Sequence, residues 1–231
     1  MSLRSLNEVL ERYPLTCGVL TANVLLYVFA AYHCGSLQID PEFQLRLGGN
    51  LYSRIGREPW RLLTSAFLHF DPIHVIFNCL VIGVVGRHLE LHFGSARLAV
   101  IYLICAVVGS ASSAGWHALN RAAVVSAGAS GAACGLVLLG YVYGRMVPER
   151  LGVFAERLQR WILWIVVFTV LVPGVDWAGH AGGAAAGAVL GRVVVPKPGD
   201  DPHPAWAISA IVGAILALAC IAQAMLSFRH G

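Results

Sequence analysis

The chain has 231 residues, of which 58% are hydrophobic and only 12% are charged. Soluble globular domains carry about 25% charged residues, so this composition excludes that class and indicates an integral membrane protein. The net charge of +4 is expected to lie mostly in loops, where it bears on membrane orientation and gives no support to nucleic-acid binding.

The N-terminal part of the chain combines a short polar segment, one apolar run and a long loop. Residues 1–14 are expected in the cytoplasm. No A-x-A-like cleavage site follows the apolar run Leu15–Cys34, so we predict a retained transmembrane helix and no signal peptide. Residues 35–63 are too charged to span a bilayer and too apolar for a plain tether, which favours an interfacial, partly helical hairpin. Trp60 and Arg61 in this loop are typical headgroup anchors, with bracing of the loop as the alternative.

Six further apolar segments predict membrane spans. A charged connection, residues 147–160, precedes the fifth span of the chain, which is short, and the proline-rich residues 196–204 form a linker before the last one. The prediction is an all-α polytopic membrane protein with a six-helix core, residues 15–195, and an additional C-terminal helix within residues 205–231. The six segments are Pro72–Phe93, Ala96–His117, Ala129–Met146, Trp161–Val172, Ala178–Val195 and Ala205–Phe228.

Charges in the short loops predict the orientation of these spans. Eight Lys and Arg residues lie in the loops after the second, fourth and sixth spans or in the adjoining span ends, whereas the loops after the third and fifth spans hold only Arg121. Because basic residues are retained on the cytoplasmic side, we predict a cytoplasmic N-terminus and an external C-terminus. Spans two, four and six then run from outside to inside, and polar residues near their starts lie at a similar depth.

Ser130 lies in a run of very small residues, 127–135. Taken alone, such a run favours close helix–helix packing. At the same depth, however, the second span offers His74 and Asn78, and the sixth span offers His180. Polar side chains are costly in hydrocarbon and usually face an interior or a wet cavity, so their convergence indicates a functional site.

The chemistry that needs these residue types is acyl transfer by a serine nucleophile. A neutral His180 can take the proton of Ser130 and return it to the leaving amine. His74, Asn78 and the backbone N–H of Ser130 are donors of the kind that stabilise a tetrahedral oxyanion. Asp176 is the only acid nearby, and we do not expect it to complete a triad.

Glycines predict how the two reacting residues meet. Gly183 and Gly187 follow His180 at i+3 and i+7, which leaves one face of the sixth span bare. We expect this face to pack closely on the side of the fourth span that carries Gly131, and to bring His180 within hydrogen-bonding distance of Ser130.

Taken together, these motifs resemble the rhomboid intramembrane serine proteases, over about Leu15 to Val195. The resemblance implies a Ser130–His180 dyad without an acid and an oxyanion hole formed by His74, Asn78 and the Ser130 amide. It also implies a first loop in the outer leaflet, lateral substrate access beside the fifth helix, and a six-plus-one arrangement with one extra C-terminal helix. The motifs that carry it, with their supporting residues, are Trp60-Arg61, His69, His74 to Asn78, Gly128-Ala129-Ser130-Gly131, and His180 with Gly183 and Gly187.

We therefore predict a serine endopeptidase of the lipid bilayer that cleaves transmembrane protein substrates near the outer membrane–water boundary and uses no cofactor. The expected location is the inner (cell) membrane of a bacterium, with the active site towards the outer face. A catalytically inactive rhomboid-like protein that binds or escorts membrane clients is the alternative, which the joint presence of all four site residues disfavours. A transporter is disfavoured because spans four and six continue inward with apolar residues alone.

Two local features complete the predictions. His88 and His92 have zinc-ligand spacing but no evident third ligand, so we predict no metal and expect Glu90 to accept hydrogen bonds from backbone or Arg groups. Some bacterial rhomboids place a tyrosine one turn after the serine to support the histidine, and here that position is Cys134. The group that orients His180 is thus left open, with Trp177 or Tyr141 as candidates.

Overall fold

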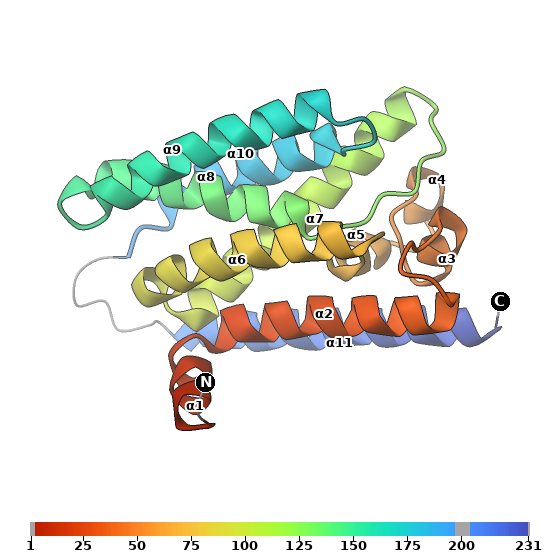
Figure 1. The fold of residues 1–231 in the computed structure, drawn as a ribbon, viewed down its shortest axis with the longest axis horizontal. Helices are drawn as coiled ribbons and strands as arrows, with labels where there is room; N and C mark the ends of the chain where they lie inside the picture. The colour runs from red at the N-terminus through yellow and green to blue at the C-terminus, as the bar shows by residue number, and fades with distance from the viewer. Residues whose placement is uncertain (1–2, 197–203, 231) are drawn as a thin grey trace.

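The structure, a computed structural model, describes residues 3–196 and 204–230. All regular elements in these residues are helices, which confirms the predicted all-α fold (Figure 1). A short helix α1 (Leu3–Arg12) precedes the bundle. The long helices that form it are α2 (Pro14–Cys34), α6 (Pro72–Phe93), α7 (Ser95–Leu119), α8 (Ser130–Met146), α9 (Pro148–Leu171), α10 (Trp177–Val193) and α11 (Pro204–His230).

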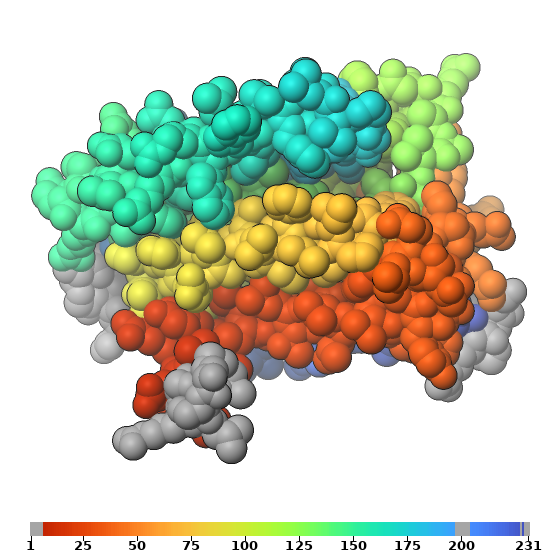
Figure 2. Space-filling model, viewed as in Figure 1, coloured from red at the N-terminus to blue at the C-terminus, as the bar shows by residue number. Residues whose placement is uncertain are grey.

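The outer surface of the bundle is that of a membrane protein. Helices α2, α6, α7 and α11 are each long and apolar enough to cross a bilayer by length and composition. Helices α6 and α9, which both reach the face shown in Figure 2, expose large apolar side chains. Phe77 of α6 is 62% exposed and Trp164 of α9 is 70% exposed. Continuous apolar exposure of this kind is typical of a surface that faces lipid.

Helices α8 and α10 pack backbone against backbone at the centre of the bundle. A Cβ added at Gly183 would overlap the carbonyl of Gly131, and one added at Gly187 would overlap the carbonyl of Gly135. One turn further, a Cβ at Gly191 would lie only 2.9 Å from the backbone oxygen of Leu139. The predicted contact between the glycine face of the sixth span and the fourth span is therefore confirmed.

The starts of α6, α8 and α10 lie at the same end of the bundle, as the alternating direction of the spans requires (Figure 1). Two of these starts are fixed by aspartate caps: Asp71 accepts from the backbone N–H of His74 at 2.8 Å, and Asp176 accepts from that of Gly179 at 2.9 Å. Asp176 is thus engaged as the cap of its own helix. The polar residues of the candidate site are brought to one level by these helix starts.

The helix that holds the predicted fifth span is longer than that span. Helix α9 begins at Pro148, so the predicted charged connection over residues 147–160 is the first half of this helix. Leu151, Ala155 and Leu158 form a buried stripe that packs against α8, where a Cβ at Gly144 would lie 2.9 Å from that of Ala155. The charged residues occupy the opposite face, an amphipathic pattern that a search for continuous apolar runs does not detect.

The first loop, residues 35–71, contains four short helices at the same end of the bundle as Ser130: α3 (Pro41–Arg46), α4 (Tyr52–Ile55), α5 (Arg61–Thr64) and the 3-10 helix η1 (Ser65–Phe67). Its predicted partly helical form is confirmed. Helix α11 contacts α7 and two of these short helices, with Ala224 only 3% exposed at the contact. Residues 197–203 of the predicted linker lie outside the described part of the chain.

The opposite end of the bundle is tied together by a buried carboxylate. Glu90 is 4% exposed and accepts from the backbone N–H groups of Leu15 (2.8 Å) and Thr16 (3.0 Å). It also accepts from the hydroxyls of Thr16 (2.6 Å) and Ser95 (2.7 Å). The expectation that Glu90 accepts backbone hydrogen bonds is confirmed, and the carboxylate joins α2, α6 and α7.

Candidate active site

Ser130 is the first residue of α8, directly after an extended segment that is held by the first loop. Asn50 and Ser126 exchange backbone hydrogen bonds of 2.8 and 2.9 Å, and the N–H of Gly128 donates to the carbonyl of Ser65 at 2.9 Å. The backbone N–H groups in the first turn of a helix have no intrahelical acceptor, so Ser130 places its amide where a negative charge is favoured.

His74 lies beside Ser130, on the other side of Gly128. A Cβ added at Gly128 would meet His74 Nε2 at 2.7 Å and Ser130 Oγ at 3.5 Å, so both side-chain atoms border the same small space. Gly128 also has a φ of +144°, which an L side chain rarely adopts. Glycine is thus required here both by backbone conformation and by the close approach of the imidazole.

Asn78 lies one turn after His74 on α6 and is 5% exposed. Its Nδ2 donates to the carbonyl of His74 at 3.0 Å. Because an amide group carries two N–H donors, one donor remains for another acceptor.

His180 is brought to this end of α8 by the glycine contacts. A Cβ at Gly131, the residue after Ser130, would lie 3.2 Å from the carbonyl oxygen of Gly179. The imidazole Nδ1 of His180 is 2.9 Å from Thr169 Oγ1 of α9. No hydrogen bond joins Ser130 to His180 among the described contacts, and the one described hydrogen bond of this imidazole is to Thr169.

A pocket of about 440 Å³ lies between α8, α9 and α10 next to His180. Its walls are mostly apolar, and Thr169 and His180 supply its polar groups. Cys134 and Trp177 also line it. Tyr141, the other sequence candidate for orienting the imidazole, does not line it. The lining residues are Cys134, Leu138, Ile162, Ile165, Val166, Thr169, Val170, Trp177, His180, Ala181 and Ala184.

Sequence reasoning missed Thr169. A signal was available, because Thr169 carries the only hydroxyl group of α9, and it stands in an otherwise apolar run, residues 161–172. A polar group in a membrane-spanning segment usually faces the protein interior or a cavity, and Thr169 follows this rule.

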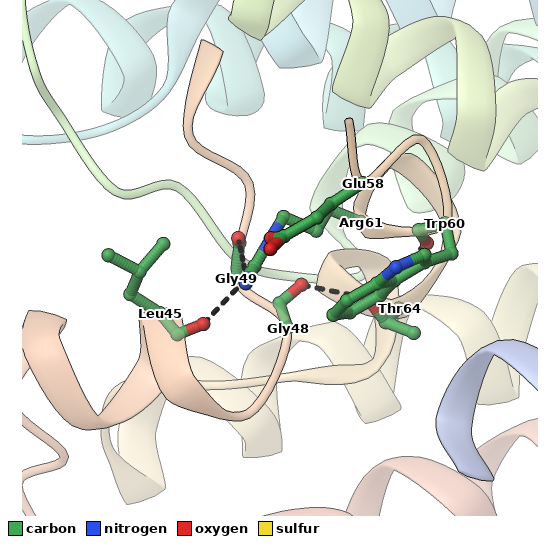
Figure 3. A network of polar contacts seen from close by, with 7 residues as sticks. All are labelled: Leu45, Gly48, Gly49, Glu58, Trp60, Arg61 and Thr64. Atoms are coloured by element: carbon green, nitrogen blue, oxygen red, sulfur yellow. Dashed lines mark hydrogen bonds and ion pairs between the residues drawn. The ribbon is translucent and has the colours of Figure 1, made fainter. Parts of the chain in front are cut away.

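Arg61 organises the first loop from its interior (Figure 3). Arg61 is 2% exposed, and its guanidinium pairs with Glu58 and donates to the carbonyls of Leu45 (2.6 Å) and Gly49 (3.0 Å). It also lies over the ring of Trp60, with the carbon of the guanidinium 4.6 Å from the ring centroid. Arg61 therefore braces the loop, which was the alternative to headgroup anchoring.

His69 is packed under this loop and does not line the pocket. It is 1% exposed, its ring centroid is 5.0 Å from that of His74, and neither ring nitrogen has a hydrogen-bond partner among the described residues. Burial lowers the pKa of His69 to about 3, so its ring is neutral at pH 7. A neutral, buried ring fits the expectation of a non-catalytic residue.

The two histidines with zinc-ligand spacing are engaged within their own helix. Nδ1 of His88 lies 2.8 Å from the carbonyl of Val84, and Nδ1 of His92 lies 2.7 Å from that of His88. No group of three potential metal ligands is found in the described part of the chain.

The fold and this polar cluster define the class of protein: a polytopic α-helical membrane protein that holds a serine, two histidines and an asparagine near the starts of three of its helices. The sequence places it more narrowly. Residues 56–197 match the model of the rhomboid domain, and the chain belongs to the rhomboid family.

Several curated proteins are similar to this chain. RHOMBOID-like protein 4 of Arabidopsis thaliana is 32% identical over 159 residues, which cover 65% of this chain and 37% of the plant protein. Rhomboid protease AarA of Providencia stuartii is 26% identical over 207 residues, 80% of this chain and 73% of the relative. Rhomboid protease GlpG of Serratia proteamaculans is 28% identical over 182 residues, which cover 77% of this chain and 61% of the relative. The chain thus spans less than half the length of the plant relatives.

Proposed function

We propose that the protein is an intramembrane serine endopeptidase, with Ser130 as nucleophile and His180 as general base. The observation that carries this proposal is the arrangement around Gly128: His74 and Ser130 border one small space, and the glycine contacts of α10 bring His180 to the same end of α8. Membership of a family that includes proteins named rhomboid proteases supports the reaction class.

In the proposed reaction, Ser130 Oγ attacks the carbonyl carbon of the scissile peptide bond as its proton passes to His180 Nε2. The imidazolium then protonates the leaving amine, and the acyl-enzyme remains. Water, deprotonated by the same nitrogen, hydrolyses the ester and restores both residues. The Ser130–His180 hydrogen bond is proposed to form when substrate binds, since catalytic hydrogen bonds are often long in unliganded sites.

The oxyanion is proposed to bind between His74, Asn78 and the start of α8. His74 supplies Nε2–H from across Gly128, and Asn78 supplies its second amide N–H. The backbone N–H of Ser130 adds a donor at the positive end of the α8 dipole. His74 must then carry a proton on Nε2, whereas His180 must have Nε2 unprotonated.

The proposed substrates are transmembrane segments of other proteins. Peptide carbonyls in a helix are already hydrogen-bonded, so the segment must become extended before Ser130 can attack. Small or helix-breaking residues near the outer membrane boundary favour this change. The distribution of basic residues supports a cytoplasmic N-terminus and a site towards the outer face, and we propose the inner (cell) membrane of a bacterium as the location. Residues 15–195 are the proposed catalytic core.

Labelling by a fluorescent fluorophosphonate tests the nucleophile. The purified protein and the Ser53→Ala control, which removes an exposed hydroxyl of the first loop, should be labelled equally. Ser130→Ala should abolish labelling, and His180→Ala should greatly slow it. Labelling that persists in Ser130→Ala would exclude this serine. A wild-type protein that is neither labelled nor able to cleave a transmembrane substrate would favour a client-binding role.

A further inference from the structure

We propose that Thr169 is the positioning residue for His180, since Cys134 stands where some bacterial rhomboids place the tyrosine that supports the histidine. Thr169 Oγ1 lies 2.9 Å from His180 Nδ1, and the two residues come from different helices, α9 and α10. Both line the same pocket. The inference rests on the proposed role of His180 and adds a residue that acts through it.

The Thr169 hydroxyl can donate or accept, and we propose that it accepts, which matches the tautomer that catalysis needs. A neutral imidazole carries one proton, and for Nε2 to accept the proton of Ser130 that proton must be on Nδ1. With Thr169 Oγ1 as acceptor, Nδ1–H is the donor and the Nε2 lone pair is free. When Nε2 takes the proton of Ser130, Nδ1–H keeps the same acceptor, so the bond persists through the reaction.

Other groups near the imidazole do not provide this acceptor. The carboxylate of Asp176 caps the start of α10 by accepting from Gly179, and among the described contacts it forms no hydrogen bond with His180. Cys134 offers a thiol, which is a weak acceptor, and the Trp177 ring nitrogen only donates. Thr169 is therefore the side chain whose chemistry and distance both suit Nδ1.

The location of Thr169 makes this bond sensitive to the position of α9. The buried residues of α9 all belong to its first half, and after Leu158 its side chains are half-buried or exposed. Val170 and Leu171, the last two residues of α9, are 76% and 71% exposed. A displacement of this loosely packed half carries Thr169 away from His180, so a substrate that moves α9 also changes the orientation of the base.

The test compares Thr169→Val, which keeps the shape and removes the hydroxyl, with Thr169→Ser, which keeps the hydroxyl. Leu171→Val is the matched control for disturbance of the same helical turn. The readouts are kcat and KM for a transmembrane substrate in proteoliposomes and the second-order rate constant of fluorophosphonate labelling. Thermal denaturation checks that each variant is folded.

We expect Thr169→Val to lower both kcat and the labelling rate by about tenfold, the effect of one lost hydrogen bond, with KM unchanged. Thr169→Ser and Leu171→Val should stay within about twofold of the wild type. Wild-type rates in Thr169→Val would overturn the inference. Equal losses in the Val and Ser variants would also overturn it, because they would indicate an effect of packing alone. A Thr169→Val variant that is faster than the wild type would mean that the bond holds the imidazole away from Ser130, and would overturn it as well. Failure of the proposed function is distinct, because then the wild type itself shows no Ser130-dependent labelling.

Discussion

Replacing Gly187 by alanine tests whether the backbone contact between α8 and α10 fixes the site. The added methyl group would overlap the carbonyl of Gly135, which belongs to a helix backbone and cannot rotate away. The helices must separate, and overpacking of this kind costs about 1–3 kcal/mol. We expect about 3 kcal/mol, because no flexible side chain is available to yield. Since α10 also carries His180, a shift of about 1 Å should lower kcat about 100-fold.

The matched control is Gly18→Ala in α2, where an added Cβ meets no atom within 4 Å. This change should leave activity intact and stabilise the helix by up to about 1 kcal/mol through its higher helix propensity. Unfolding is followed by tryptophan fluorescence in mixed micelles of increasing SDS fraction, and kcat is measured in parallel. If Gly187→Ala unfolds at the same SDS fraction as Gly18→Ala and retains full kcat, close packing of α8 and α10 does not control the site.

Three further predictions concern the first loop and its neighbours. Arg61→Lys removes the forked donor to two backbone carbonyls and should lower the free energy of unfolding by about 2 kcal/mol in the same assay, whereas an unchanged value would make the network dispensable. The pKa of His69 is about 3 in the folded protein and 6.5 for an ordinary histidine, so below pH 6.5 the unfolded chain binds more protons than the folded one. The free energy of unfolding should therefore fall as the pH drops from 6.5. His69→Phe should make this free energy less dependent on pH. Ala224→Leu adds bulk where α11 meets Gly48, since a Cβ added at Gly48 would lie 3.2 Å from that of Ala224. It should reduce thermal stability by more than the same change at the exposed residue Ala222.

The sequence was sufficient to predict the helical bundle because the signals are local. A run of about 20 apolar residues defines a span wherever it occurs, and the spacing of Gly183 and Gly187 from His180 sets their common face without reference to other helices. Alternating spans then bring Ser130, His74 and His180 to one end of the bundle. These predictions need only helix geometry and the membrane as a solvent.

The remaining features depend on contacts between distant residues. The extension of α9 to Pro148 is stabilised by burial of Leu151 and Ala155 on α8, which an apolar-run criterion does not register. Arg61 reaches carbonyls 12 and 16 residues earlier in the chain, and no pattern in the sequence specifies those partners. Thr169 was visible as an isolated hydroxyl, but its pairing with His180 depends on how the end of α9 lies over α10.

These contacts divide the proposed catalytic machinery into a fixed part and an adjustable part. Ser130 and its backbone N–H are held by backbone contacts: the start of α8, the glycine contacts and the hydrogen bond from Gly128 to Ser65. Backbone contacts at van der Waals distance leave little room for movement. The imidazole of His180 is instead held by one side chain from the loosely packed half of α9. If Thr169 positions the base, the orientation of the His180 imidazole is the variable that substrate binding can alter, while the nucleophile and its backbone N–H stay in place.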